Sequence, residues 1–355
     1  MKPLNIAVSA LHRGENPQPG PSVIKSIRRV RSNVNVIGFS YDSLDSGLYT
    51  YDDDHVDTAF LMPYPGKGPK VLLERIDEIL KTCPIDIIIP NQDFEIPNYL
   101  DLQNDLKDRD IRVGIPSRKA FEQRDKENLY KLCKSVGAKS PKTILANSIE
   151  DAQIAAEEIG YPVMLKGRMY GAAQANTPAD VPGVYHKMQS LWGGHVLVQA
   201  LIESKDELSV IGLGDGQGNV VGSCSIRKIL LTHNGKTFSG IVIRNPEMTR
   251  ATEKIIKKLK WFGPFEIEFI GSDRGYEVIE MNPRFPSWVD FPSQIKCNLP
   301  NALVSMLVSP GKSPAIAECE PGKFFVRHCV DLAGDLRQLA HLVDKGVVKC
   351  TALLR

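Results

Sequence analysis

Short apolar runs alternate with segments of helical spacing along roughly the first 115 residues of the chain. The runs at 4–10, 34–39 and 85–90 predict strands, and the apolar spacing at 22–30 and 70–81 predicts helices between them. The run at 85–90 is almost continuous, which is typical of a strand covered on both faces of a parallel sheet. The pattern therefore predicts an N-terminal α/β domain with a parallel sheet over residues 1–116.

A second unit begins near residue 117. Helical spacing at 126–136 stops at a glycine, and Ser148 with Asp151 is typical of a helix start. An apolar run at 161–166 predicts a strand. These elements predict a small lobe over residues 117–192.

From Gly194 onward, predicted strands follow one another through turns, and a basic helix is predicted at 247–260. Asn234 and Gly235 form a strong hairpin signal. Two further strands, at 264–271 and 276–282, flank the turn sequence SDRG. This part predicts an antiparallel α+β lobe over residues 193–312, followed by a C-terminal segment, 313–355, with little assignable pattern.

Composition narrows the class of protein. A chain of 355 residues is too long for one core, and 42% hydrophobic with 24% charged residues is the balance of a globular protein. A formal net charge of +2 gives no general attraction to nucleic acid, and no apolar run is long enough to cross a membrane. The seven cysteines are scattered without a CxxC pair, which favours reduced thiols and a cytoplasmic location.

The stretch PFEIEFIGSDRGYEVIEMNPRFPSW carries the most chemistry. Alternation places Glu266 and Glu268 on one face of the first strand, and it places Tyr276, Val278, Glu280 and Asn282 on one face of the second. Glu268 and Glu280 are equally distant from residue 274, so they face each other in a simple hairpin. Two carboxylates beside an amide oxygen suit Mg²⁺ that carries substrate phosphates.

Two interpretations of this stretch stay open at this level. The acids of an isolated hairpin are most often solvated surface residues. Here they alternate with Phe, Ile, Val and Met, and a carboxylate in apolar surroundings needs a partner. Arg284 follows the last acid closely, and its guanidinium would suit a transferring phosphoryl group or a carboxylate substrate.

The sequence resembles the ATP-grasp superfamily over roughly residues 4–310, in particular the branch that contains carbamoyl phosphate synthetase large subunits, biotin carboxylases and L-amino-acid ligases. The element that carries the resemblance is E-(x)11-E-x-N-P-R, from Glu268 to Arg284. The resemblance implies a Rossmann-like N-terminal domain followed by a two-lobed ATP-grasp fold. It also implies that Glu268, Glu280 and Asn282 bind the Mg²⁺ (or Mn²⁺) of ATP and that Arg284 contacts phosphate or substrate.

Other positions fit the same family in order along the chain. The resemblance implies phosphate contacts for Lys126 and Lys166, adenine contacts near Gln199, Ala200 and Ile202, and a ribose contact for Glu207. Gly171 lies in the segment 167–174, which corresponds to a phosphate-covering loop but lacks the run of glycines found in many relatives. Residues 90–95 correspond to a region that faces the second substrate.

Two basic positions have no settled role from the sequence. Arg227 and Lys228 are adjacent, and they either point toward the transferred phosphoryl group or form a surface charge pair. Arg327, in the C-terminal segment, either reaches the site or caps the fold.

The resemblance implies an ATP-dependent carboxylate–amine ligase that acts through an acyl phosphate and releases ADP and phosphate. The substrates would be small acids and amines, such as amino acids or peptides, and the protein would be a homodimer or a monomer without nucleic-acid or membrane partners. Two alternatives stay open: a bicarbonate-using carboxylase or carbamoyl-phosphate-type step, and a non-catalytic nucleotide-binding regulatory subunit.

Overall fold

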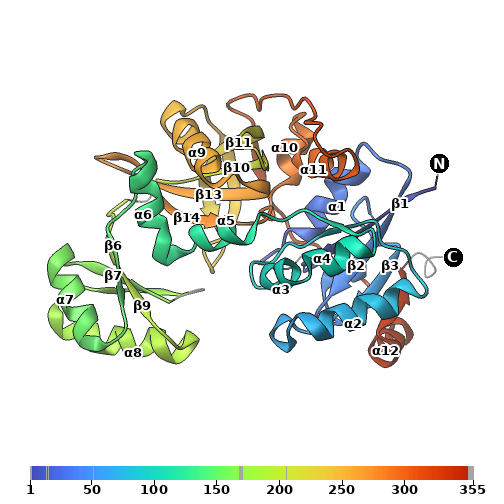
Figure 1. The fold of residues 1–355 in the computed structure, drawn as a ribbon, viewed down its shortest axis with the longest axis horizontal. Helices are drawn as coiled ribbons and strands as arrows, with labels where there is room; N and C mark the ends of the chain where they lie inside the picture. Colours follow the sequence, from blue (N-terminus) through green and yellow to red (C-terminus); the bar gives the residue numbers. More distant parts are fainter. Residues whose placement is uncertain are drawn as a thin grey trace.

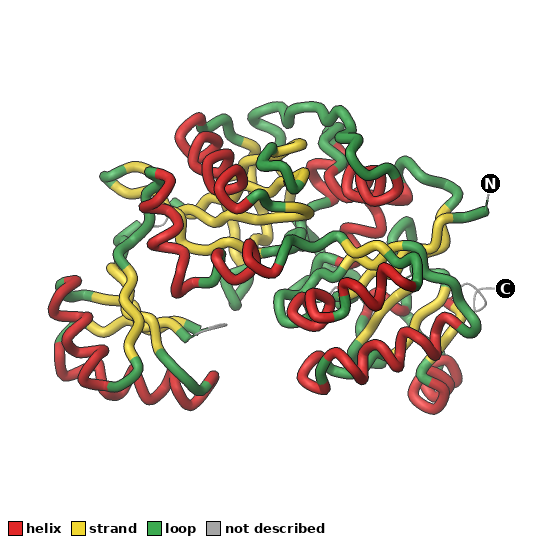
Figure 2. The backbone as a smooth tube through the Cα atoms, in the orientation of Figure 1, coloured by secondary structure: helices red, strands yellow, loops and turns green. Residues whose placement is uncertain are grey.

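The computed structural model describes residues 2–12, 14, 16–50, 52–167, 171–204 and 206–350. In these residues the strands form three sheets, which lie in three parts of the molecule (Figure 1). Figure 2 shows that helices flank the strands in each part.

The first sheet has the strand order β16-β3-β2-β1-β4-β5. Its N-terminal strands pair in parallel, as the alternating pattern predicts: β1 (Leu4–Ser9), β2 (Val34–Ser40), β3 (Thr58–Leu61), β4 (Ile87–Ile89) and β5 (Arg112–Val113). Both faces are covered. Helices α2 (Pro69–Leu80), α3 (Ile96–Asp101) and α4 (Gln103–Asp108) pack on the face of Ala7, and α1 (Gly20–Arg28) packs on the face of Ile6 and Val8. Short 3₁₀ turns occur at Ser46–Leu48 and Pro65–Lys67.

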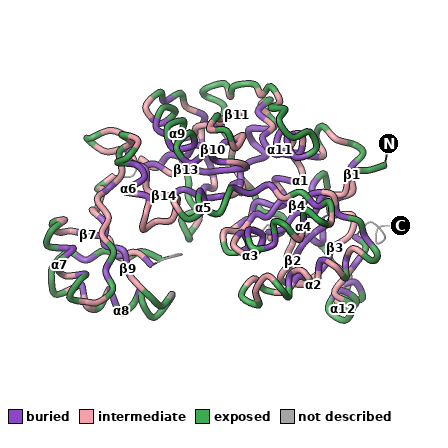
Figure 3. Tube along the Cα trace, in the orientation of Figure 1, coloured by how far each residue is buried: buried purple, intermediate pink, exposed green. Residues whose placement is uncertain are grey.

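The second sheet is antiparallel, with the order β14-β13-β10-β11-β12-β15. Its strands are β10 (Glu207–Asp215), β11 (Val220–Leu231), β12 (Thr237–Val242), β13 (Phe262–Ser272), β14 (Gly275–Asn282) and β15 (Phe324–Val326). One face packs against α9 (Pro246–Leu259), α5 (Arg118–Gln123) and α6 (Lys126–Val136). The residues of β10 and β13 are mostly buried at the centre of this part (Figure 3).

The other face of the second sheet shares an apolar core with the first sheet. Helices α10 (Asp290–Gln294) and α11 (Leu299–Val308) lie between them, and Leu303 belongs to the same buried cluster as Ile24 of α1 and Ile211 of β10. A continuous apolar core therefore joins the first two sheets and fixes their relative position.

The third sheet, β6-β9-β7-β8, has its own core. It consists of β6 (Thr143–Ala146), β7 (Val163–Lys166), β8 (Ala172–Ala175) and β9 (Val196–Ala200), covered by α7 (Ile149–Ile159) and α8 (Val181–Trp192), with a 3₁₀ turn at Pro178–Asp180. The side chain of Ser148 accepts from the Asp151 N–H, which makes the predicted N-cap of α7.

Three segments lie elsewhere than the predicted boundaries place them. Strand β9 pairs between β6 and β7, so the third sheet extends past the predicted boundary at residue 192. Helix α6 packs on the second sheet, since Leu129 and Leu132 are buried in its core. The C-terminal segment divides: β15 extends the second sheet, whereas α12 (Leu336–Lys345) and β16 (Val347–Lys349) return to the first. Each of these placements results from strand pairing or packing between distant segments, which the local sequence pattern does not indicate.

In the described part of the chain, no helix is both long and apolar enough to span a membrane. The seven cysteines are free thiols.

Candidate active site

The hairpin β13–β14 brings the predicted acids together. Glu268 pairs directly with Glu280, and Glu266 pairs with Asn282. Directly paired residues share a face of the sheet, so three carboxylates and one amide lie side by side. The predicted opposition of Glu268 and Glu280 is confirmed.

The remainder of the second strand departs from strict alternation. The register shifts after Glu268, so that Phe269 pairs with Val278 and Ile279 is the extra residue of a β-bulge. Val278 is fully buried in the core with Phe269, and Tyr276 packs against the same core. The prediction that Tyr276 and Val278 share the face of Glu280 is wrong, because one inserted residue reverses the alternation.

Two lysines neutralise the paired acids. The Lys228 Nζ lies 2.6 Å from Glu268 Oε2 and 3.3 Å from Glu207 Oε2, and its side chain is only 3% exposed. The Lys126 Nζ lies 2.9 Å from Glu280 Oε1. The lysines reach the hairpin from β11 and from the first turn of α6, respectively.

The electrostatics of the acids reflect this arrangement. Burial raises the pKa of Glu268 and the nearby Glu266 and Glu280 raise it further, although Lys228 opposes them. Burial also acts to raise the pKa of Glu280, but attraction to Lys126, Lys166 and Arg284 outweighs it and the pKa is lowered. For Lys228, burial acts to lower the pKa, and the carboxylates, Glu268 first, reverse the sign and raise it. The site thus holds charged groups that compensate one another.

Arg284 connects the hairpin to the N-terminal domain. Its Nη1 donates to Glu266 Oε2 at 3.1 Å, and its Nε donates to Asp93 Oδ1 at 3.1 Å. Asp93 follows β4 at the end of the first sheet and also lies 3.9 Å from Arg124. The region 90–95, predicted to face a second substrate, therefore borders the paired acids.

Lys166 lies at the end of β7, on the third sheet. Burial and the charge of Lys126 lower its pKa, and Glu280 and Glu268 partly offset them. Lys166 is thus close enough to Lys126 and Glu280 for their charges to interact across the space between the third and second sheets.

The remaining residues of the expected nucleotide set belong to the third sheet or to the segments that leave it. Gln199 donates from Nε2 to Thr143 Oγ1 at 2.8 Å, and the Ala200 N–H donates to the Lys142 carbonyl, so both groups are used within the third sheet. Ile202 lies in the connection between β9 and β10. The Gly171 carbonyl accepts from the Gly167 N–H, but Arg168–Tyr170 of the expected phosphate loop lie outside the described residues.

The structure separates Arg227 from this set. Its Nε donates to Asp206 Oδ1 at 2.7 Å, and half of its side chain is exposed. Neighbouring residues on a strand point to opposite faces, so Lys228 enters the site and Arg227 does not. Of the two adjacent residues, Lys228 alone stays a catalytic candidate.

Sequence reasoning left out several residues of the site. Glu266 was placed on the face of Glu268 by the alternation but was given no role there. Its Oε1 accepts from Ser209 Oγ at 2.9 Å. Lys236 and Trp288 also line the site, and they come from segments far apart in sequence that carry no shared local signal.

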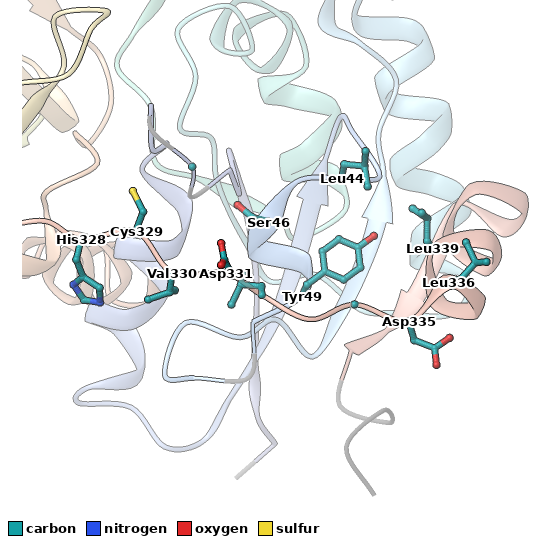
Figure 4. A pocket seen from close by; sticks show the side chains of 13 residues that line it. Leu44, Ser46, Tyr49, His328, Cys329, Val330, Asp331, Asp335, Leu336 and Leu339 are labelled. Atoms are coloured by element: carbon teal, nitrogen blue, oxygen red, sulfur yellow. The ribbon is translucent and has the colours of Figure 1, made fainter.

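A cavity of about 330 Å³ extends from the acids toward the N-terminal domain. Its wall includes Glu268, Glu280, Arg284, Gln92 and Lys236. A larger cavity of about 560 Å³ lies between Leu44 and Tyr49 on one side and the segment 328–339 on the other (Figure 4). None of the predicted site residues lines the larger cavity, so the smaller one is the candidate active site.

Comparison with known proteins agrees with the family resemblance of the sequence. Residues 125–289 match the family model for the carbamoyl-phosphate synthase L chain, ATP binding domain. The carbamoyl phosphate synthase large chain of Sulfurisphaera tokodaii is 21% identical over 263 residues, which are 71% of this chain and 25% of that protein. This chain thus spans about a quarter of the length of that relative.

Solved structures share the fold. The biotin carboxylase domain of the Hydrogenobacter thermophilus 2-oxoglutarate carboxylase, solved with MgADP, ADP and bicarbonate, has a TM-score of 0.69 at 19% identity, covering 91% of this chain and 74% of that one. The L-amino acid ligase of Bacillus licheniformis has a TM-score of 0.66 at 14% identity, covering 91% and 79%. The resemblance to the ATP-grasp superfamily is confirmed, with residues 125–289 similar to the ATP-binding domain of the carbamoyl-phosphate synthase large chain.

Proposed function

We propose that this protein is an ATP-dependent ligase that activates a carboxylate as an acyl phosphate and joins it to an amine, releasing ADP and phosphate. The observation that carries the proposal is the pairing of Glu268 with Glu280, each held by a lysine, inside a domain that matches an ATP-binding family. Charge-compensated, partly buried acids in the wall of a cavity suit phosphoryl transfer, where the protein must above all balance charge and position groups.

The donor set fits a divalent cation carried by the nucleotide. Glu268, Glu280 and Asn282 offer two carboxylates and an amide on one face, which are ligands that Mg²⁺ and Mn²⁺ accept. No group of three or more His, Cys, Asp or Glu side chains in the described residues is arranged to hold a metal alone. This agrees with a cation that takes its other ligands from phosphates and water, and such a cation would neutralise charge on the phosphate oxygens.

Lys126 and Lys166 are the proposed phosphate contacts. In the structure Lys126 forms an ion pair with Glu280. Lys166 is near enough to both residues for their charges to shift its pKa. A polyphosphate with its cation would take over both partners: the metal would satisfy the acids, and the phosphates would satisfy the lysines. The proposed nucleotide position is completed by backbone groups around Ile202 and by Glu207 for the ribose.

Arg284 is the proposed holder of the attacking carboxylate or the transferring phosphoryl group. It borders the cavity beside the acids, with Asp93 and Glu266 as its carboxylate partners. A substrate carboxylate would compete with Asp93 for the same guanidinium, which offers a fixed fork of donors. Holding the acid next to the phosphates lowers the entropic part of the barrier.

The experiment is an assay of turnover products with a panel of acids and amines. ADP and phosphate are expected, and hydroxylamine added during turnover should trap a hydroxamate of the acid. Arg284→Ala should lower the hydroxamate yield at least tenfold while changing ATP affinity by less than threefold. Release of AMP would overturn the acyl-phosphate mechanism, and ADP release that requires only bicarbonate would favour the carboxylase alternative.

A further inference from the structure

Charge is unevenly compensated around the candidate active site. At one end of the cavity the acids and bases are matched: Glu268 with Lys228, Glu280 with Lys126, and Arg284 with Asp93 and Glu266. Two further cations lie near Ser287: Lys236 lines the cavity, and Arg327 contacts the lining residue Ser287 from outside it. Among the residues that the structure describes, neither of these has a carboxylate within ion-pair distance.

Arg327 is placed there by the tertiary structure. It directly follows β15, which pairs with β12, and its N–H donates to the Phe238 carbonyl at 3.2 Å. Its Nη1 donates to Ser287 Oγ at 3.0 Å, and Ser287 lines the cavity. Burial lowers the pKa of Arg327 to about 10. A partly buried guanidinium whose side-chain partner is a hydroxyl has lost solvation without gaining an opposite charge.

Lys236 approaches the same place from the turn between β11 and β12. It lines the cavity, and its Nζ contact is the Asn16 carbonyl at 3.5 Å. Partial burial lowers the pKa of Lys236, repulsion from Arg284 and Arg327 lowers it further, and attraction to Glu266 only partly offsets them. Lys236 therefore lies near enough to both arginines to interact with them unfavourably.

A neutral donor lies in the same wall. Trp288 lines the cavity and is 3% exposed, and its buried indole N–H has no acceptor in the structure. Buried N–H groups normally find a partner. This end of the cavity thus presents the ammonium of Lys236, and the guanidinium of Arg327 lies directly behind Ser287.

We propose that this end of the cavity binds a second anionic group of the acid substrate, a carboxylate or a phosphate, so that the substrate is a dianion whose other carboxylate reacts beside Arg284. The inference rests on the proposed function. The second anion would compensate Lys236 and Arg327, and the distance between the two ends would select the length of the substrate. A monocarboxylate would leave both cations uncompensated.

Direct binding tests the proposal without turnover. Calorimetry on the whole chain with Mg-ADP would compare dicarboxylates from malonate to adipate, matched monocarboxylates, and inorganic phosphate. At least one dianion, or phosphate, should bind at least tenfold more tightly than the monocarboxylates. Arg327→Gln and Lys236→Gln should each remove at least tenfold of that affinity. Arg244→Gln, which removes an exposed arginine, is the control and should change it less than twofold.

The outcomes separate the two proposals. If a dianion binds through Lys236 and Arg327 but no acid stimulates ADP release, the anion site stands and the ligase function fails. If neither dianions nor phosphate bind more tightly than monocarboxylates, or if Arg244→Gln weakens binding as much as the other two variants, the anion site is overturned. Mg-ADP affinity measured for each variant reports the folded state, and Lys236→Gln, on an exposed turn, keeps the test intact if Arg327→Gln fails to fold.

Discussion

The Lys228 Nζ lies 2.6 Å from Glu268 Oε2, and only 3% of the Lys228 side chain is exposed. The side chain of Arg227, which precedes it on the same strand, is half exposed. The ion pair is therefore shielded from solvent, and each partner depends on the other for compensation. Two adjacent basic residues thus differ completely in what they contribute to the protein.

The first prediction follows from this pair. Lys228→Met should lower the free energy of unfolding by about 3 kcal/mol, because it leaves Glu268 buried beside Glu266 and Glu280 without its cation. Urea denaturation at pH 7 measures the change. Arg227→Met is the matched control and should lie within about 0.5 kcal/mol of wild type. Adding Glu268→Gln to Lys228→Met should recover part of the loss, and strict additivity of the two changes would contradict the pairing.

The second prediction concerns activity at the same two positions. Lys228→Gln should reduce substrate-dependent ADP release at least tenfold, since Lys228 contacts two acids of the proposed nucleotide site. Arg227→Gln should leave it within twofold, because Arg227 binds Asp206 outside the cavity. A coupled ADP assay at saturating ATP measures the rate of each variant against wild type. Equal losses in both variants would mean that the functional separation drawn from the strand geometry is wrong.

The third prediction concerns the metal ligands. Mg-ATP at about one hundred times its Kd should stabilise the wild-type fold by about 2.7 kcal/mol. Glu280→Gln should remove most of this stabilisation, because it deletes a proposed metal ligand and the acid partner of Lys126. Thermal denaturation with and without Mg-ATP measures both. Glu253→Gln, an exposed change on α9, is the control, and a ligand-dependent shift in Glu280→Gln equal to that of the control would count against the assignment.

The fourth prediction is a pH dependence at Glu95. Burial raises its pKa to about 8, and the charge of Asp93 adds to the shift. The folded state therefore keeps a proton that the unfolded state has lost above pH 4.5. The contribution of Glu95 to stability is present at low pH and declines as the pH rises toward 8, by up to about 1.4 kcal/mol per pH unit.

Glu95→Gln removes the titration and keeps the shape of the side chain. Its stability relative to wild type should rise between pH 5 and pH 8 and then level off. Urea denaturation of both proteins at pH 5, 6, 7 and 8 measures the difference. Parallel stability profiles of the two proteins would show that Glu95 titrates normally in the folded state.

The sequence by itself determined the features that depend on local geometry. The period of two along a strand and the short turn after Ser272 are enough to oppose Glu268 and Glu280, because both are properties of one hairpin. The same holds for the parallel sheet of the first domain and for the N-cap at Ser148. The period of two would also have separated Arg227 from Lys228, had it been applied there.

Tertiary structure alone decided the rest. The bulge at Ile279 moves Val278 into the core, since packing against Phe269 outweighs the regular ladder. Strand β9 joins the third sheet, and β16 returns to the first, through pairings between segments far apart in the chain. Arg284 meets Asp93 across 191 positions, and Arg327 reaches Ser287 across 40. Such contacts leave no periodic trace in the sequence, because their energy comes from charge and burial between elements that only the complete fold brings together.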